Sequence, residues 1–224
     1  MTKRKLIIVG DSAFAEIARE YFDADSAYRA VAFAVESAYL RRDRLHGLPV
    51  VAFETMEHSY APSDYDVFVA ITYQQLNRLR TRLLTAAKQK GYALASYFSP
   101  RAFIWPNVVF GEHCFVFEDN TIQPFVKVGN NVIFWSGNHV GHHSVVHDNC
   151  FVSSQVVISG FCEVGENSFL GVNCTLGNNL SVGRDNWIGP GITLTQSTQP
   201  SALFGAPAVE PSRVSTLRFF KIGE

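Results

Sequence analysis

The sequence predicts a small α/β domain followed by a stack of triangular coils built from short parallel strands. Two observations lead to this prediction. Of the 224 residues, the first 101 include 25 Asp, Glu, Lys and Arg, whereas residues 102–198 include only nine. The charge-poor stretch also places an apolar residue at every sixth position, without any insertion.

The repeat begins at Ile104 and ends at Leu194, and all sixteen positions six residues apart are apolar. A period of six differs from the 3.6-residue period of an α-helix, and as a multiple of two it suits short strands. Gly directly follows eight of these anchor positions, which is typical of strands separated by turns that need Gly, Asn or Asp. Three strands close a coil of 18 residues, and coils stack ~4.8 Å apart. We therefore expect a little over five coils.

The four cysteines all occupy the small-residue position of the hexad: Cys114, Cys150, Cys162 and Cys174. Cys114 and Cys150 share a corner but lie two coils apart, too far for a disulfide. We expect buried packing thiols in a protein of a reducing compartment.

Residues 1–101 are predicted to form a βαβ-type domain. The expected elements are strands at 5–9, 29–35 and 66–71 and helices at 13–22 and 74–90, the second ending at Gly91. Gly10, Asp11 and Ser12 lie between a strand and a helix start, where free N–H groups can bind phosphate. The segment lacks a GxGxxG or Walker motif, so Asp11 as a helix cap remains an equal alternative.

Composition excludes several classes of function. The net charge is −1, and Lys127 and Arg184 are the only cations between 102 and 198, which excludes a broad nucleic-acid surface. No apolar run approaches the ~20 residues of a membrane helix, and Leu6–Val9 is too short for a signal peptide. We expect a cytoplasmic protein that binds neither nucleic acid nor membrane.

Four histidines fall within nine residues of the repeat, at His139, His142, His143 and His147. Such a cluster on a charge-poor surface favours chemistry over a structural role. The 18-residue coil places Gly160 above His142, which leaves room for a ligand, and encloses His143 between Phe125 and Phe161. His142 and His147 have the most space, and His142 is the predicted general base.

Several segments together resemble bacterial sugar acyltransferases. They are Lys5-Leu-Ile-Ile-Val-Gly, Ala32-Phe-Ala-Val-Glu, Val69-Ala-Ile, Ser99-Pro-Arg-Ala, Asn167-Ser-Phe-Leu-Gly-Val-Asn and Phe204-Gly-Ala-Pro-Ala. The family includes bacillosamine and perosamine N-acetyltransferases and sialic-acid O-acetyltransferases, and the resemblance covers about residues 5–210. It implies a Rossmann-like domain at 1–101 that binds a nucleotide sugar, a left-handed parallel β-helix with hexapeptide repeats at 102–210, and a tail at 211–224.

The resemblance also implies site residues. His142 occupies the place of the catalytic histidine, but His143 stands where an acidic residue commonly follows, so His143, Asp148 or a neighbouring subunit remain candidates to orient it. The pantetheine arm of acetyl-CoA is expected along Gly160, Val172 and Gly189 towards Gly205, Ala206 and Pro207. The nucleotide sugar is expected at Gly10, Asp11, Ser12, Ala13, Phe14, Glu36, Thr72 and Tyr73, although Ala13-Phe14-Ala15 replaces the family's Gly-His-Gly turn and Val35 its strand-end acid.

The implied activity is metal-free acetyl transfer from acetyl-CoA to an amino group of a nucleotide-linked deoxyamino sugar, in surface polysaccharide biosynthesis. Direct attack with His142 as base is expected, with backbone N–H groups stabilising the oxyanion, in a homotrimer whose sites lie between subunits. A sugar hydroxyl, as in sialic acid, is the alternative acceptor. A γ-type zinc hydratase is an alternative enzyme class on the same fold. It would need a third histidine two coils before His142, and Pro106 occupies that position. A non-catalytic β-helix scaffold would have no need of the clustered histidines.

Overall fold

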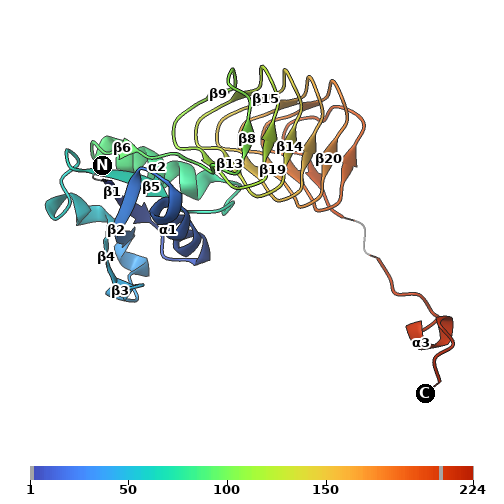
Figure 1. The fold of residues 1–224 in the computed structure, drawn as a ribbon, viewed down its shortest axis with the longest axis horizontal. Helices are drawn as coiled ribbons and strands as arrows, with labels where there is room; N and C mark the ends of the chain where they lie inside the picture. Colours follow the sequence, from blue (N-terminus) through green and yellow to red (C-terminus); the bar gives the residue numbers. More distant parts are fainter. Residues whose placement is uncertain (1–2, 207–208, 224) are drawn as a thin grey trace.

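The computed structural model describes residues 3–206 and 209–223 and shows two regions packed side by side (Figure 1). An α/β region precedes a β-helix of stacked triangular coils, and it lies beside the first coils (Figure 1). A short helix, α3 (Thr216–Phe219), lies in the C-terminal tail with its side chains exposed.

The α/β region is built on one sheet with the strand order β3-β4-β2-β1-β5-β6. Its strands are β1 (Arg4–Val9), β2 (Tyr28–Val35), β3 (Arg44–Leu45), β4 (Leu48–Ala52), β5 (Tyr65–Val69) and β6 (Ala93–Leu94), and its helical segments are α1 (Ala13–Asp25), η1 (Ser37–Tyr39), η2 (Phe53–His58) and α2 (Arg78–Gln89). Only the β3–β4 pair is antiparallel among these strands. Leu6 and Ile8 of β1 pack on the α1 side, and Ile7 and Val9 on the α2 side. The helices therefore cover opposite faces, as alternation along a strand requires.

The predicted strands and helices of this region are present with shifted ends. Helix α2 begins at Arg78 instead of residue 74, because Gln75, Leu76 and Asn77 have left-handed φ values of 52°, 50° and 68°. Gly91, with φ of 91°, follows the helix as expected. Strands β3, β4 and β6 were not predicted.

The β-helix consists of two-residue strands that pair in parallel with the strand 18 residues further on, except that the last strand of the first sheet pairs with the strand 16 residues before it. The first sheet contains β7 (Tyr97–Phe98), β10 (Phe115–Val116), β13 (Ile133–Phe134), β16 (Phe151–Val152), β19 (Phe169–Leu170), β22 (Trp187–Ile188) and β24 (Leu203–Phe204). The second contains β8 (Phe103–Ile104), β11 (Thr121–Ile122), β14 (His139–Val140), β17 (Val157–Ile158), β20 (Thr175–Leu176) and β23 (Thr193–Leu194). The third contains β9 (Val109–Phe110), β12 (Lys127–Val128), β15 (Val145–Val146), β18 (Glu163–Val164) and β21 (Ser181–Val182).

All sixteen predicted anchors are the second residue of strands β8 to β23, and they form or border the apolar core. The prediction of stacked 18-residue coils is confirmed. The β-helix begins slightly before residue 102, since β7 already pairs with β10 of the first sheet. We call the turns after the first, second and third sheets the first, second and third corners.

Glycine has a different role at the corners from the one expected. The glycine that follows an anchor does not carry the positive φ, which falls two residues later on residues such as Asn131 and Asn167. Instead it lets coils approach, because a Cβ on Gly141 would lie 2.5 Å from the backbone nitrogen of Gly160. Glycine therefore follows an anchor because the next coil lies too close for a side chain. The left-handed φ that the turn requires is adopted two residues later, mostly by Asn and Asp.

The cysteines are free, buried and placed in the corners, as predicted. Burial raises the pKa of Cys114 to about 11 and the pKa values of Cys150 and Cys174 to about 12. Thiols with such raised pKa values hold little thiolate at neutral pH, so they act as packing groups.

One aromatic cluster joins the two regions. Phe14 of α1 lies 5.7 Å from Phe115 and 5.9 Å from Trp135, both in the β-helix, measured between ring centroids. Phe22 and Tyr97 belong to the same buried cluster. The α/β region and the first sheet thus share a core, and their relative placement is fixed by packing.

Arg80 adds a polar clamp to this junction. The side chain is fully buried, and its guanidinium donates to the carbonyl oxygens of Thr72, Asn131 and Asn149, three segments far apart in sequence. Burial lowers the pKa of Arg80 to about 9, which leaves the group charged at neutral pH. A buried guanidinium is tolerated only when its donors are satisfied, and here the acceptors come from the β5–α2 loop and the third corner.

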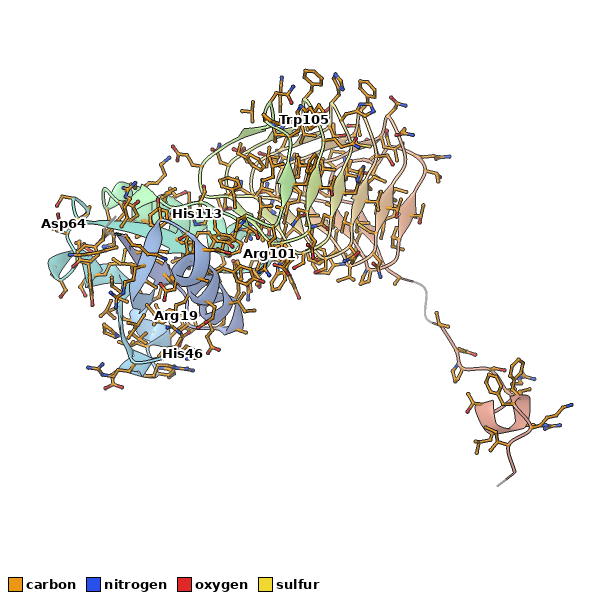
Figure 2. All side chains as sticks on the ribbon, viewed as in Figure 1. Arg19, His46, Asp64, Arg101, Trp105 and His113 are labelled. Carbon is orange, nitrogen blue, oxygen red and sulfur yellow. The ribbon has the colours of Figure 1, made fainter. Side chains whose placement is uncertain are left out.

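His113 lies beside this clamp, where the two regions meet (Figure 2). Its Nε2 accepts a hydrogen bond from the backbone N–H of Val69 at 2.8 Å, and its Nδ1 faces Asn131 Oδ1 at 3.0 Å. Burial, followed by the nearby Arg80, lowers the pKa of His113 from 6.5 to about 3. The junction therefore contains a neutral imidazole.

We expect acid to weaken this junction. Below pH 6.5 His113 becomes protonated in the unfolded state but stays neutral in the folded state. The contribution of His113 to the free energy of unfolding is therefore fully present above pH 6.5 and decreases progressively towards pH 3. Between pH 6.5 and pH 5 the loss amounts to about 2 kcal/mol. Urea unfolding at several pH values and one protein concentration tests this. His113→Gln removes the titrating group and should flatten the pH dependence; equal slopes for the two proteins would contradict the assignment.

Candidate active site

The second corner holds His142 and His143 between β14 and β15. Both side chains are exposed, in contrast to the buried anchors Val140 and Val146 on either side. His142 Nδ1 lies 3.1 Å from His143 Nδ1, and the two rings are nearly perpendicular at 88°. The corner therefore presents a hydrogen-bonded pair of imidazoles on the surface.

The position of His142 depends on Gly160 in the next coil. A Cβ on Gly160 would lie 3.0 Å from His142 Cε1 and 3.1 Å from Nε2, so the ring rests on the glycine. The backbone N–H of His142 donates to Gln123 Oε1 at 3.0 Å. Within residues 3–206 and 209–223, no hydrogen-bond partner occupies His142 Nε2. An exposed imidazole with a free Nε2 is suited to proton transfer.

The four clustered histidines do not form one site. His139 lies on β14 of the second sheet, half-buried, and His147 lies at the start of the third corner with its Nε2 2.7 Å from Glu163 Oε1. Asp148 is also at the third corner, where its carboxylate accepts from the backbone and side chain of Asn130. Asp148 therefore does not orient His142, which corrects one of the alternatives left open by the sequence.

The peptide N–H groups of the histidine corner are already occupied. Those of Gly141 and His143 donate to the carbonyl oxygens of Ile158 and Pro124, and that of His142 donates to Gln123. The prediction that backbone N–H groups stabilise an oxyanion is therefore not supported at these three residues.

A second candidate feature is an aromatic groove of about 400 Å³ beside the first sheet. It is lined by Thr72, Tyr73, Trp135, Phe151, Ser153, Ser154, Phe169, Val172, Trp187 and Pro190. Phe169 and Trp187 stack with centroids 3.9 Å apart, and the Tyr73 ring lies 4.7 Å from Phe169. Such flat apolar faces suit the base or sugar ring of a ligand.

The predicted substrate-binding residues gather at the carboxyl ends of β1, β2 and β5. Thr72 and Tyr73 line the groove, and Gly10, Asp11, Ser12 and Ala13 form the turn into α1. Ser12 is the N-cap residue of α1, but its side chain makes no capping hydrogen bond. Asp11 forms an ion pair with Arg42, with 3.4 Å between Asp11 Oδ2 and Arg42 Nε.

Two of these predicted residues have other roles. The Phe14 ring is buried in the aromatic core that joins the two regions, so it cannot contact a ligand. Both carboxylate oxygens of Glu36 accept hydrogen bonds of 2.8 Å from Arg82, and this pairing lowers the pKa of Glu36. Both residues follow a strand end closely in the sequence, which is the usual place of pocket residues. The residues that they contact in the structure are distant in sequence, so the local pattern does not reveal these contacts.

The predicted cofactor residues do not form one track within a single chain. Gly160 shares the second corner with His142, whereas Val172, Gly189, Gly205 and Ala206 follow strands of the first sheet at the first corner. Pro207 lies outside the described residues. The second sheet separates the two groups, so a single chain offers no continuous path past both Gly160 and Val172, and the expected path stays a prediction for an assembly of subunits.

The described part of the chain contains no cluster of three His, Cys, Asp or Glu arranged to hold a metal ion. None of its helices is both long enough and apolar enough to cross a membrane.

Comparison with known proteins confirms the resemblance inferred from the sequence. Residues 143–178 match the family described as bacterial transferase hexapeptide (six repeats). This chain therefore matches the hexapeptide repeat over part of its β-helix. Its fold is a Rossmann-like α/β region followed by a left-handed parallel β-helix.

Solved structures share this architecture over nearly the whole chain. The acetyltransferase domain of PglB from Neisseria gonorrhoeae is 21% identical, with a TM-score of 0.81, covering 94% of this chain and 100% of that one. A mutant perosamine N-acetyltransferase from Caulobacter crescentus, in complex with CoA and GDP-perosamine, is 24% identical, with a TM-score of 0.80 and coverages of 90% and 93%. WeeI from Acinetobacter baumannii is 18% identical, with a TM-score of 0.60 and coverages of 90% and 96%.

The role of Gly160 can be tested directly. Gly160→Ala would place a methyl group about 3 Å from the His142 ring, which must then turn away, while the fold persists because Gly160 has no left-handed φ. Gly177→Ala is the matched control one coil further on, since a Cβ there meets nothing closer than 3.4 Å. Crystal structures of both variants should show a displaced His142 ring only in the first. An unmoved ring in Gly160→Ala would show that the glycine is not needed for this pose.

Proposed function

We propose that the protein is an acetyl-CoA-dependent acetyltransferase that acetylates an amino group of a nucleotide-linked deoxyamino sugar. The observation that carries the proposal is His142, an exposed imidazole whose Nδ1 is engaged and whose Nε2 is free, seated on a glycine. The fold shared with a perosamine N-acetyltransferase crystallised with CoA and GDP-perosamine supports the same activity.

The aromatic groove is the proposed acceptor site. It lies where β5 ends, and it joins the apolar rings of Phe151, Phe169 and Trp187 to the polar Thr72 and Ser153. Parallel sheets bind ligands outside the carboxyl ends of their strands, so the turn at Gly10–Ser12 is placed to meet the phosphates. A sugar hydroxyl is the second acceptor class, because a base at His142 serves an alcohol as well as an amine.

The groove and His142 lie apart in one chain, and we propose that a homotrimer brings them together. His142 is at the second corner, whereas the groove follows the first sheet to the first corner. The second sheet between them presents Phe103, Thr121, His139, Val157, Thr175 and Thr193 outward, without a charged residue. Phe103 is 56% and Val157 37% exposed, as expected of a face that a neighbouring subunit covers.

The proposed reaction is a direct transfer. The acceptor amine attacks the thioester carbonyl to form the C–N bond of a tetrahedral intermediate, His142 Nε2 takes the proton that the amine loses, and the C–S bond breaks as the intermediate collapses. The same proton then passes to the departing thiolate of CoA. With the corner N–H groups occupied, the donor to the oxyanion comes from outside this corner. We further propose a role in surface polysaccharide biosynthesis in the cytoplasm, where acetyl-CoA and nucleotide-linked sugars would be available as substrates.

Replacement of His142 tests the chemistry. His142→Ala should lower kcat by about 10²- to 10⁴-fold without unfolding the protein, because the side chain is exposed and supplies only the base. Release of CoA thiol is measured with a panel of nucleotide-linked 3- and 4-amino sugars, with sialic acid as the hydroxyl acceptor. His147→Ala is the control, since His147 is also exposed but pairs with Glu163 at another corner. A His142→Ala protein with wild-type thiol release would refute the assignment.

Subunit mixing tests where the site lies. His142→Ala and Tyr73→Ala proteins are each expected to be inactive, the first without its base and the second without a wall of the groove. If each site combines His142 of one subunit with the groove of another, unfolding and refolding an equal mixture should restore about a quarter of the sites. Separately refolded variants, combined afterwards without exchange, provide the control. No recovery in correctly assembled mixed trimers would place both groups in the same chain.

A further inference from the structure

We propose that His143 is the positioning residue for His142, in the place where the family resemblance leads us to expect a carboxylate. The inference rests on the proposed role of His142 as the base. His143 accepts the hydrogen bond from His142 Nδ1–H and so holds the lone pair of His142 on Nε2, the atom that faces outward beside Gly160.

The rings of His142 and His143 are in contact through their Nδ1 atoms. The Nδ1 atoms are 3.1 Å apart, and of two imidazole nitrogens at that distance one must donate and the other accept. No carboxylate competes for His142 Nδ1 within the described residues: Asp148 is engaged by Asn130, and Glu163 by His147. His143 is therefore the one described side chain bonded to His142 Nδ1.

The second step is the stack that fixes His143. Its ring lies between Phe125, with centroids 4.6 Å apart, and Phe161, with centroids 4.9 Å apart and planes inclined by 19°. These two phenyl rings are 54% exposed, so they add little to the apolar core. Their contacts instead prevent the His143 ring from turning its Nδ1 away from His142.

The backbone supplies an independent observation. Phe125, His143 and Phe161 all adopt left-handed φ values, of 66°, 60° and 58°. The equivalent corner positions elsewhere hold mostly Asn, Asp or Gly, which tolerate that conformation, whereas the bulky side chains of Phe125 and Phe161 are strained there. Three adjacent coils accept this cost where the aromatic rings enclose His143, and nowhere else among the described corners do three such rings stack.

The consequence is a defined tautomer for each ring. His142 carries its hydrogen on Nδ1 and His143 on Nε2. With the opposite arrangement His142 Nε2 would bear a hydrogen and could not accept a proton from the acceptor amine. His143 thus acts through His142 and need not touch either substrate.

The tautomer can be measured without any activity. In the wild-type protein labelled with ¹⁵N-histidine, the NMR spectrum should show His142, assigned from His142→Ala, protonated at Nδ1. His143→Phe keeps the aromatic stack but removes the acceptor, and His142 should shift towards the Nε2–H form. Asn179→Phe is the matched control, because it places a phenyl ring at a left-handed position of the same corner two coils away. A wild-type His142 in the Nε2–H form would overturn the proposal.

Kinetics provide the second readout. His143→Phe should lower kcat about 10- to 100-fold and leave the KM for acetyl-CoA within twofold, and His143→Asp, which restores an acceptor but not the stacked ring, should recover part of the loss. A His143→Phe enzyme with wild-type kcat and an unchanged tautomer would refute the positioning role alone. Full activity of His142→Ala would instead refute the proposed function. If His143→Phe failed to assemble, Phe161→Ala, which opens one side of the stack, should shift the tautomer in the same direction.

Discussion

The 18-residue register of the coils is the constraint on which the remaining structure depends. Each two-residue strand bonds to the strand one coil away, so residues separated by 18 positions lie directly above one another. A shift of one residue would turn every anchor outward, because side chains alternate between faces. The close approach at Gly141 and Gly160 exists only in this register. The placement of His142 on a glycine and of His143 between two phenyl rings is therefore a consequence of how the coils stack.

The junction with the α/β region converts that stack into part of a binding site. The Arg80 guanidinium donates hydrogen bonds to carbonyl oxygens of the β5–α2 loop and of two successive coils. The Asn77 side chain donates to the carbonyl oxygen of Asn167, one coil further on. These contacts tie the loop carrying Thr72 and Tyr73 to the β-helix. Asn77, the last of the three left-handed residues before α2, makes one of these contacts itself and also accepts from Arg80, so the β-helix supports its unusual backbone conformation. The groove is thus shaped by residues that do not line it.

Sequence periodicity predicted the β-helix almost completely, because one strong local rule, an inward apolar side chain every six residues, governs each strand. Periodicity did not predict the features that depend on contacts between residues distant in sequence. Arg80 lies on the apolar face of α2 together with Leu83 and Ala87, and only the fold shows the distant carbonyl oxygens that satisfy its buried guanidinium. His139, His142 and His147 are neighbours in sequence but lie on a sheet and at two different corners, since an 18-residue coil separates residues only a few positions apart. Phe14 occupies the position of a phosphate-binding turn and packs in the core instead.

The proposed use of His143, where the resemblance leads us to expect a carboxylate, is consistent with the electrostatics of its surroundings. Phe125 and Phe161 flank it, and the second sheet beside it presents no charged side chain. In the proposed trimer a neighbouring subunit covers this face, and a carboxylate there would lose its hydration while gaining a single hydrogen bond. An imidazole accepts the same hydrogen bond without a fixed negative charge, and its flat ring packs against both phenyl groups. The aromatic stack and the uncharged sheet therefore favour the same solution, an orienting group that is held by packing instead of by charge.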